Sequence, residues 1–176
     1  MEIDPGRIAA APFEPFGGQG WRQLSPRYDP LSGEGARING GRFNPPGSFP
    51  VLYVCRSRAC AVAELKRFGE RQAIGVVGLL PRILYRYQIR LDRVLDLTKD
   101  EVRGRVGVGL DVLGGPDWTA CQELGTVAHA LGAQGIESPS ATGEGNVLAV
   151  LLQHVGLGRV EPELVEEWHS GDELEA

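Results

Sequence analysis

The chain has 176 residues, 42% of them hydrophobic, which fits one globular domain with a core of its own. Its formal net charge of −5 argues against non-specific nucleic-acid binding, which needs a basic surface. The longest apolar run, residues 147–152, is too short to cross a membrane, and the acidic start lacks the apolar stretch of a secretory signal. We therefore expect a cytoplasmic protein that contacts neither membrane nor nucleic acid directly.

The charge is distributed unevenly along the chain. Residues 1–99 contain 15 Lys and Arg against 9 Asp and Glu, whereas residues 100–176 contain 3 against 14. A basic first half can hold a local pocket for phosphate groups even in an acidic protein. The acidic second half is interpreted as a solvated surface that ends in an acidic tail, helical in part, at residues 161–176.

The first half of the chain predicts several strands and one helix. Residues 1–20 are rich in Pro, Gly and Ala and show no period, so they are expected to be extended on the surface or partly disordered. Ser57 is suited to cap a helix that runs to about Phe68 and ends at Gly69. The segment 29–50 reads as a structured, glycine-rich loop. Strands are expected where apolar and β-branched residues gather or alternate, at 21–28, 51–55, 74–80, 83–91 and 94–97.

The second half adds a short helix and a glycine-rich loop over 99–116, and then a helix over 118–131 that Asp117 can cap. A strand that starts at Ile136 and a buried strand at 147–154 follow. Strands and helices are mixed without regular alternation. The sequence therefore predicts a single α+β domain with a mixed β-sheet rather than a doubly wound fold.

The strongest functional signal lies in residues 31–66. Arg42, Tyr53 and Glu64 are eleven residues apart twice over and fall on the expected loop, strand and helix. This layout supplies a fixed cation, an aromatic face and a carboxylate. It suits an anionic, aromatic-bearing ligand that contains a sugar, for which a nucleotide is the obvious candidate.

Arg42 follows two glycines, which let the backbone pass close to a ligand, and its planar guanidinium matches phosphate or carboxylate groups. The alternative is that Arg42 bridges loop carbonyls. Arg22 and Arg37 are weaker candidates on the same grounds.

Glu64 shares a helix face with Ala61 and Phe68, so its carboxylate is expected to point inward. A buried carboxylate is costly unless it is paired or functional. The alternative is a solvent-side salt bridge to a neighbouring Lys or Arg. Tyr53 lies in the middle of a strand, where core packing is the default interpretation.

The remaining polar residues give weaker signals. The three histidines show no HxxxH or HExxH spacing, so no metal site is expected. Ser140 can donate a hydrogen bond to a ligand or, alternatively, cap a turn. Rossmann, Walker-A and GxSxG motifs are absent. Residue types and spacing alone support an α+β domain with a candidate pocket for an anion and a sugar.

The segment LSGEGARINGGRFNPPG, with FPVLYV and ACAVAELKR after it, resembles the signature of RES-domain toxins, the toxin half of bacterial RES–Xre type II toxin–antitoxin pairs. Later segments match in the same order: LDLT, GPDWTACQELG and a Gly-Ile…Pro-Ser-Ala stretch. The resemblance covers roughly residues 20–155. It implies a RES domain at 21–160 between an extended segment at 1–20 and the acidic tail at 161–176.

The resemblance also implies a compact fold similar to ADP-ribosyltransferases of the diphtheria-toxin type, with a split sheet and NAD in the cleft. The family's functional arginine, tyrosine and glutamate fall on Arg42, Tyr53 and Glu64. Its upstream arginine falls on Arg22. A hydroxyl residue completes the set. In many members it is the serine of a Pro-Ser motif, which corresponds to Ser140 here, and in another version of the motif it follows an Asp-Trp pair, which corresponds to Thr119.

The activity implied by the resemblance is cleavage of the nicotinamide–ribose bond of NAD+, by hydrolysis or phosphorolysis, which depletes NAD and arrests growth. Arg42 and Arg22 would hold the diphosphate, Tyr53 would pack on the nicotinamide end, and Glu64 would stabilise positive charge on the ribose. The alternatives are mono-ADP-ribosylation of a cellular protein and a catalytically idle binding module. No cofactor beyond NAD as substrate is expected. The implied partner is an Xre-type helix-turn-helix antitoxin, which would bind the DNA and form a hetero-oligomer with this chain.

Overall fold

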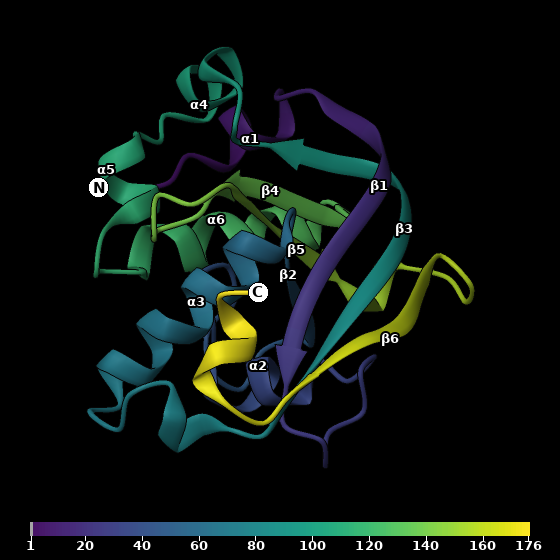
Figure 1. Ribbon diagram of the computed structural model, residues 1–176. Helices are drawn as coiled ribbons and strands as arrows, with labels where there is room; N and C mark the ends of the chain where they lie inside the picture. Colours follow the sequence, from purple (N-terminus) through teal and green to yellow (C-terminus); the bar gives the residue numbers. More distant parts are fainter. Residues whose placement is uncertain (1) are drawn as a thin grey trace.

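Six β-strands and six α-helices follow one another irregularly in residues 2–176, the part of the chain that the computed structural model describes (Figure 1). The strands are β1 (Phe13–Leu24), β2 (Val51–Cys55), β3 (Arg82–Asp96), β4 (Gly135–Pro139), β5 (Asn146–Leu151) and β6 (Val160–Trp168). The helices are α1 (Pro5–Ala9), α2 (Glu34–Asn39), α3 (Arg58–Arg71), α4 (Asp100–Val106), α5 (Leu110–Gly114) and α6 (Thr119–Ala130). The expected α+β class is confirmed, and the likeness to ADP-ribosyltransferases stays a prediction.

The longest strand, β3, organises the sheet. One of its edges pairs antiparallel with β1, and the other edge is shared between β6 at the start of β3 and β4 at its end. β4, β5 and β2 continue the sheet, and β2 returns to β1 through the single residue pair Trp21–Cys55. Strands β1, β2, β5, β4 and β3 therefore close into a barrel-like ring, with β6 attached to β3 outside it (Figure 1). Because β3 and β4 are parallel, the sheet is mixed, as expected.

The middle of β3 shows why this segment forms a strand. Tyr87, Ile89 and Leu91 are buried, while Gln88 and Arg90 between them are exposed. Alternation of this kind puts one face of a strand into the core and leaves the other in water. The strand expected over these residues is confirmed, and it extends further in both directions.

β1 begins at Phe13, inside the segment expected to be extended or partly disordered. The chain is extended from Phe13 onward, as expected, but it is ordered by backbone pairing along β3, and Pro5–Ala9 form a short helix instead. One of the three glycines of β1, Gly20, is required by packing. A Cβ on Gly20 would lie 2.7 Å from Cγ2 of Val54 and 3.1 Å from Cδ1 of Ile89. With three glycines close together in its middle, β1 shows no clear hydrophobic period.

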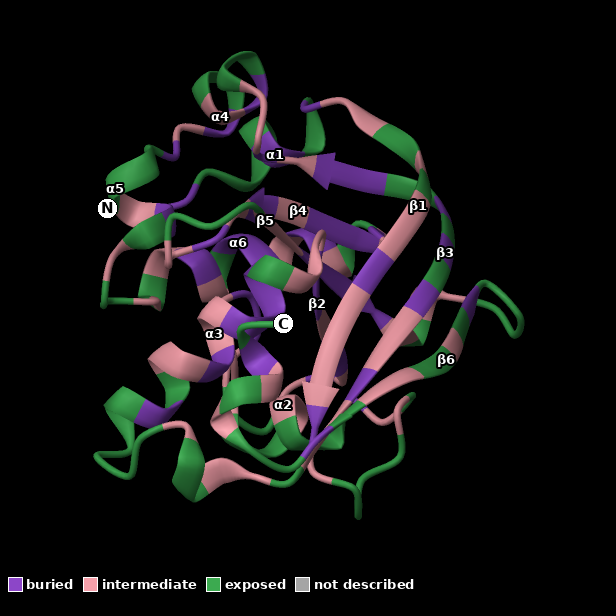
Figure 2. Cartoon of the chain, viewed as in Figure 1, coloured by how far each residue is buried: buried purple, intermediate pink, exposed green. Residues whose placement is uncertain are grey.

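The strand expected at 74–80 is also wrong. This segment forms a turn and a short 3-10 helix at Val77–Leu79. Ile74 is 53% exposed and Val77 is 71% exposed, so their apolar side chains reach no sheet (Figure 2). Gly75, with φ of +67°, turns the chain out of an extended path.

The helix after β2 runs further than expected. Ser57 caps α3 by accepting a hydrogen bond from the amide of Cys60 at 3.1 Å, as expected, but the helix continues past Gly69 to Arg71. Gly69 is required by a close approach and does not end the helix. A Cβ there would lie 2.6 Å from the carbonyl carbon of Gly75.

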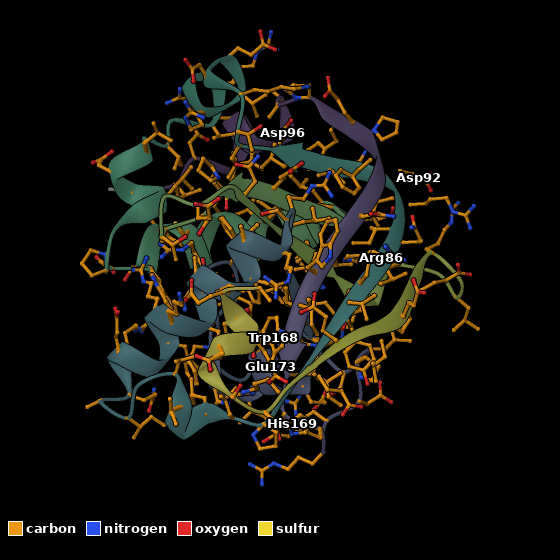
Figure 3. The ribbon with its side chains drawn as sticks, in the orientation of Figure 1. Arg86, Asp92, Asp96, Trp168, His169 and Glu173 are labelled. Carbon is orange, nitrogen blue, oxygen red and sulfur yellow. The ribbon has the colours of Figure 1, made fainter. Side chains whose placement is uncertain are left out.

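Residues 161–176, expected as an acidic and partly helical tail, form most of β6 and a 3-10 helix at Gly171–Leu174. Three of the four acidic side chains of β6 are exposed, and Arg86 pairs with one of them, Glu163, at 2.7 Å, whereas Glu166 is half-buried and pairs with Arg58 at 2.8 Å. Trp168 and Leu174 are buried, with 1% and 3% exposure. Figure 3 shows Trp168 at the end of β6, beside the C-terminal turn that carries Glu173. The segment is thus part of the folded domain.

Helices cover the ring on two sides. A large apolar cluster joins α1, α4, α5 and α6 to the strands, and a second cluster joins α3 to β3 and to the C-terminal segment (Figure 2). None of the helices in residues 2–176 is both long and apolar enough to cross a membrane. Within the same residues, no group of three or more His, Cys, Asp or Glu side chains is arranged to hold a metal ion.

Gly125 allows α6 to pack directly on the loop that carries Arg42. A Cβ at this position would lie 1.8 Å from the carbonyl oxygen of Phe43. We expect Gly125→Ala to lower the free energy of unfolding by about 1–3 kcal/mol in chemical denaturation, because the helix and the loop must separate.

Gly104 provides a matched control, because it lies inside α4 and a Cβ there would meet nothing within 4 Å. Gly104→Ala is expected to stabilise the protein by up to about 1 kcal/mol through helix propensity. Equal stability of the two variants would contradict the tight contact between α6 and the loop.

Candidate active site

A cavity of about 500 Å³ opens beside the single pair that joins β1 to β2. Most of its wall comes from β1, β2, α3, the end of β4 and the loops before β2 and α6, with smaller parts from α2, the start of β3, β5 and the loop after β4. Its charged lining residues are Arg22, Arg42, Glu64, Arg67, Arg71 and Arg82. Within residues 2–176, none of these five arginines has a carboxylate oxygen within 4 Å. Five guanidinium groups against one carboxylate suit an anionic ligand of nucleotide size.

The loop between α2 and β2 places Arg42 in the cavity wall. Gly40 adopts φ of +76°, a conformation that favours glycine, and Gly41 pairs with Asn44 in a narrow turn. Arg42 Nη1 donates a hydrogen bond to the carbonyl of Gly115 at 3.1 Å. Its guanidinium therefore contacts one loop carbonyl, as the alternative interpretation expected, and also lines the cavity.

Tyr53 holds this loop in place. Its hydroxyl donates to Oδ1 of Asn44 at 2.7 Å and accepts from the amide of Phe43 at 2.9 Å, while its ring lines the cavity. Burial raises the pKa of Tyr53 well above its usual range, so the phenol stays protonated at neutral pH. Tyr53 thus fixes the residues that flank Arg42.

We expect Tyr53→Phe to lower the free energy of unfolding by about 1–3 kcal/mol, because a backbone amide and the buried Asn44 lose their partner. Chemical denaturation measures this change. Tyr28→Phe is the control, since Tyr28 is 56% exposed, and it is expected to change stability by less than about 0.5 kcal/mol. Equal effects of the two substitutions would contradict the positioning role of the Tyr53 hydroxyl.

Glu64 lies nearly two turns into α3 and lines the cavity. Its Oε1 accepts a hydrogen bond from Oγ of Ser140 at 2.7 Å. Ser140 is 7% exposed and also contacts the hydroxyl of Thr142 at 2.6 Å. The salt bridge considered for Glu64 is absent from residues 2–176, where Lys66 pairs with Glu175 instead. Glu64 therefore has a neutral partner and presents its charge to the cavity.

The sequence left open whether Ser140 or Thr119 supplies the hydroxyl of the site. Ser140 lines the cavity and contacts Glu64. Thr119 is exposed and is not a lining residue; its hydroxyl donates to Oδ1 of Asp117 at 2.7 Å at the start of α6. Only Ser140 is brought to the carboxylate.

The other two arginines expected at the site separate in the structure. Arg22 lines the cavity from β1, and its Nη1 donates to the carbonyl of Ser32 at 3.4 Å. Arg37 is not among the lining residues; it pairs with Glu34 on α2 at 2.9 Å. Arg37 thus serves the helix rather than the cavity.

Among the lining residues that the sequence did not single out for ligand binding are three arginines and a tryptophan: Arg67, Arg71, Arg82 and Trp118. Arg67 and Arg71 follow Glu64 at helical spacing, so the helix pattern was an available signal once the helix was extended to Arg71. Trp118 and Arg82 come from distant elements and carry no local signal.

A family model, curated relatives and a solved structure relate this chain to the same group of proteins. The RES domain family model matches residues 19–170. The NAD(+) phosphorylase MbcT of Mycobacterium tuberculosis, strain H37Rv, is 34% identical over 148 residues, which is 80% of each chain, and MbcT of Mycobacterium bovis matches equally well. The crystal structure of the M. tuberculosis MbcT–MbcA toxin–antitoxin complex contains a chain with a TM-score of 0.83 and 31% identity, over 93% of this chain and 90% of that one. The protein is thus a member of the RES domain family.

Proposed function

We propose that this protein cleaves the nicotinamide–ribose bond of NAD+ and so depletes NAD, acting as the toxin of a toxin–antitoxin pair. The observation that carries the proposal is the lone carboxylate of Glu64, held by Ser140 in a cavity otherwise charged by five arginines. NAD+ matches this distribution of charge, because it combines a diphosphate with a ribose that becomes cationic during cleavage. The similarity to MbcT supports the same reaction.

Bond cleavage needs little acid–base chemistry. The bond between C1″ of the ribose and the pyridinium nitrogen breaks with its electron pair on nitrogen, so nicotinamide leaves as a neutral molecule. Positive charge develops on the ribose, as in glycoside hydrolysis. Glu64 stabilises this charge, and Arg22 and Arg42 hold the diphosphate. The ring of Tyr53 closes the wall of the cavity near the nicotinamide end.

Inorganic phosphate is the acceptor that we rank first. One of its oxygens forms the new bond to C1″, which gives ADP-ribose 1″-phosphate and nicotinamide. The excess of guanidinium groups favours a second anion in the cavity beside the diphosphate. The name of MbcT, a phosphorylase, supports this choice. NAD is the substrate, and the reaction requires no other cofactor.

The toxin role implies a partner that blocks the cavity. The MbcT–MbcA complex supports an antitoxin as that partner, and we propose an Xre-type helix-turn-helix protein that would bind the DNA itself. An arginine-lined opening is complementary to an acidic segment. The reaction takes place in the cytoplasm, where NAD is available.

The test is NAD+ turnover by the purified protein with and without phosphate, with the products resolved by mass. ADP-ribose 1″-phosphate that appears only with phosphate supports phosphorolysis, and ADP-ribose in both conditions indicates hydrolysis. Turnover that requires cell lysate, with label from NAD on a protein, would replace the proposal by mono-ADP-ribosylation. Absence of turnover under all conditions, from protein that is folded, would indicate a binding module.

A further inference from the structure

Trp118 brings two of the cavity arginines together. The guanidinium carbon of Arg42 lies 5.4 Å from the centroid of the Trp118 ring, and that of Arg71 lies 5.3 Å from the same centroid. Arg42 comes from the loop before β2, Arg71 is the last residue of α3, and Trp118 directly precedes α6. Three elements that are distant in the sequence therefore meet at one indole on the cavity wall.

The two arginines at Trp118 form a pair of like charges. Two guanidinium groups repel each other, and neither has a carboxylate partner in residues 2–176. The negative face of an indole attracts cations, so Trp118 stabilises both groups where an acidic side chain would neutralise them. The same loop adds the Gly115 carbonyl as a hydrogen-bond acceptor for Arg42. The two cations are held in place and remain available to an anion.

The position of Arg71 relative to Glu64 fits a dinucleotide. They are seven residues apart on α3, which places Arg71 two turns, roughly 10 Å, further along the helix. A ribose at Glu64 carries its 5″-phosphate a few bonds away, within reach of a long side chain that extends back from Arg71. Arginine forks also match phosphate oxygens in pairs.

We propose, on the basis of the function proposed above, that Trp118 is a positioning residue that holds Arg42 and Arg71 as a paired grip on the diphosphate of NAD+. Arg71 is then a substrate-binding residue additional to Arg22 and Arg42. Because the grip acts on phosphates, it discriminates between substrates by their phosphate groups and contributes nothing to bond cleavage itself.

The test compares Trp118→Ala, Trp118→Phe and Arg71→Gln with wild type on two substrates, NAD+ and nicotinamide riboside, which has the same scissile bond but no phosphate. Loss of the grip is expected to raise KM for NAD+ about tenfold or more in Trp118→Ala and Arg71→Gln, with kcat changed by less than about threefold. The Phe variant keeps an aromatic face and is expected to stay near wild type. Turnover of nicotinamide riboside is expected to be unchanged in all three.

Arg90→Gln is the matched control, since Arg90 is exposed on β3 and does not line the cavity. Equal losses on NAD+ and on nicotinamide riboside, or an unchanged KM for NAD+ in Trp118→Ala, would overturn the proposal.

Calorimetric binding of ADP, which carries a diphosphate and no scissile bond, separates this inference from the proposed function. We expect ADP to bind the wild type, and to bind Trp118→Ala and Arg71→Gln at least tenfold more weakly. This result supports the grip even if NAD+ is not turned over. Suppose instead that the wild type turns over NAD+ but binds no ADP, or binds ADP no more tightly than the two variants. The proposed function would then stand, and the grip would be overturned.

Discussion

Glu64→Gln is expected to lower NAD+ turnover by about 10²- to 10³-fold or more, with little change in KM. Gln has nearly the same shape as Glu, and its amide oxygen can still accept the hydrogen bond from Ser140. The substitution therefore removes the negative charge and leaves the packing in place. Because the proposed role of this charge is to stabilise the developing cation of the ribose, the loss is expected in kcat. The measurement is nicotinamide release at saturating NAD+.

Glu70→Gln is the control for Glu64→Gln, because Glu70 is an exposed residue of the same helix and does not line the cavity. It is expected to retain wild-type turnover. Thermal unfolding of both variants shows whether α3 stays folded. If Glu64→Gln kept more than about a third of the wild-type rate, charge stabilisation by this carboxylate would be excluded as the main source of catalysis.

The convergence of Arg42, Tyr53 and Glu64 on one cavity followed from local patterns. A glycine pair gives a tight loop, a β-branched run gives β2, and Ser57 caps a helix, so each residue was placed on the correct element. All three residues line the cavity. Their catalytic and binding roles stay predictions until turnover is measured.

The role of Tyr53 within the fold was not accessible from sequence. A tyrosine in mid-strand reads as core, and nothing local indicates that its hydroxyl would bond to the loop nine or ten residues earlier. Trp118 and Arg82 were missed for a similar reason, because an isolated aromatic or cation has meaning only through neighbours from other elements. Contacts of this kind depend on tertiary packing, which periodicity does not encode.

The two strand errors share one physical cause. Residues 74–80 have the apolar content of a strand but pair with no strand, whereas residues 13–20 have little apolar content but pair along the edge of β3. In both cases, the presence or absence of a neighbouring strand to pair with determined whether the segment formed a strand. Strand propensity describes how well a side chain fits a pleated surface that other strands must supply.

The C-terminal segment is expected to be essential for stability, although its composition suggested a solvated tail. Trp168→Ala is predicted to lower the free energy of unfolding by about 3–5 kcal/mol, which is a large fraction of the total for a domain of this size. The indole is 1% exposed, and its Nε1 donates to Oε2 of Glu166 at 2.7 Å. The guanidinium carbon of Arg58 lies 5.6 Å from the ring centroid, and Arg58 also bonds to both oxygens of Glu166 at 2.8 and 2.9 Å.

Because Arg58 opens α3, the loss of Trp168 also loosens the helix that carries Glu64. Chemical denaturation followed by circular dichroism measures the change in stability. Leu157→Ala is the control, since Leu157 is fully exposed just before β6 and its truncation is expected to cost less than about 0.5 kcal/mol. If the two substitutions cost the same, residues 161–176 would behave as the dispensable acidic tail that their composition indicated. If they differ as expected, most of the acidic residues there belong to the exposed side of a structural strand, and the position of α3, the helix that carries Glu64, depends on that strand.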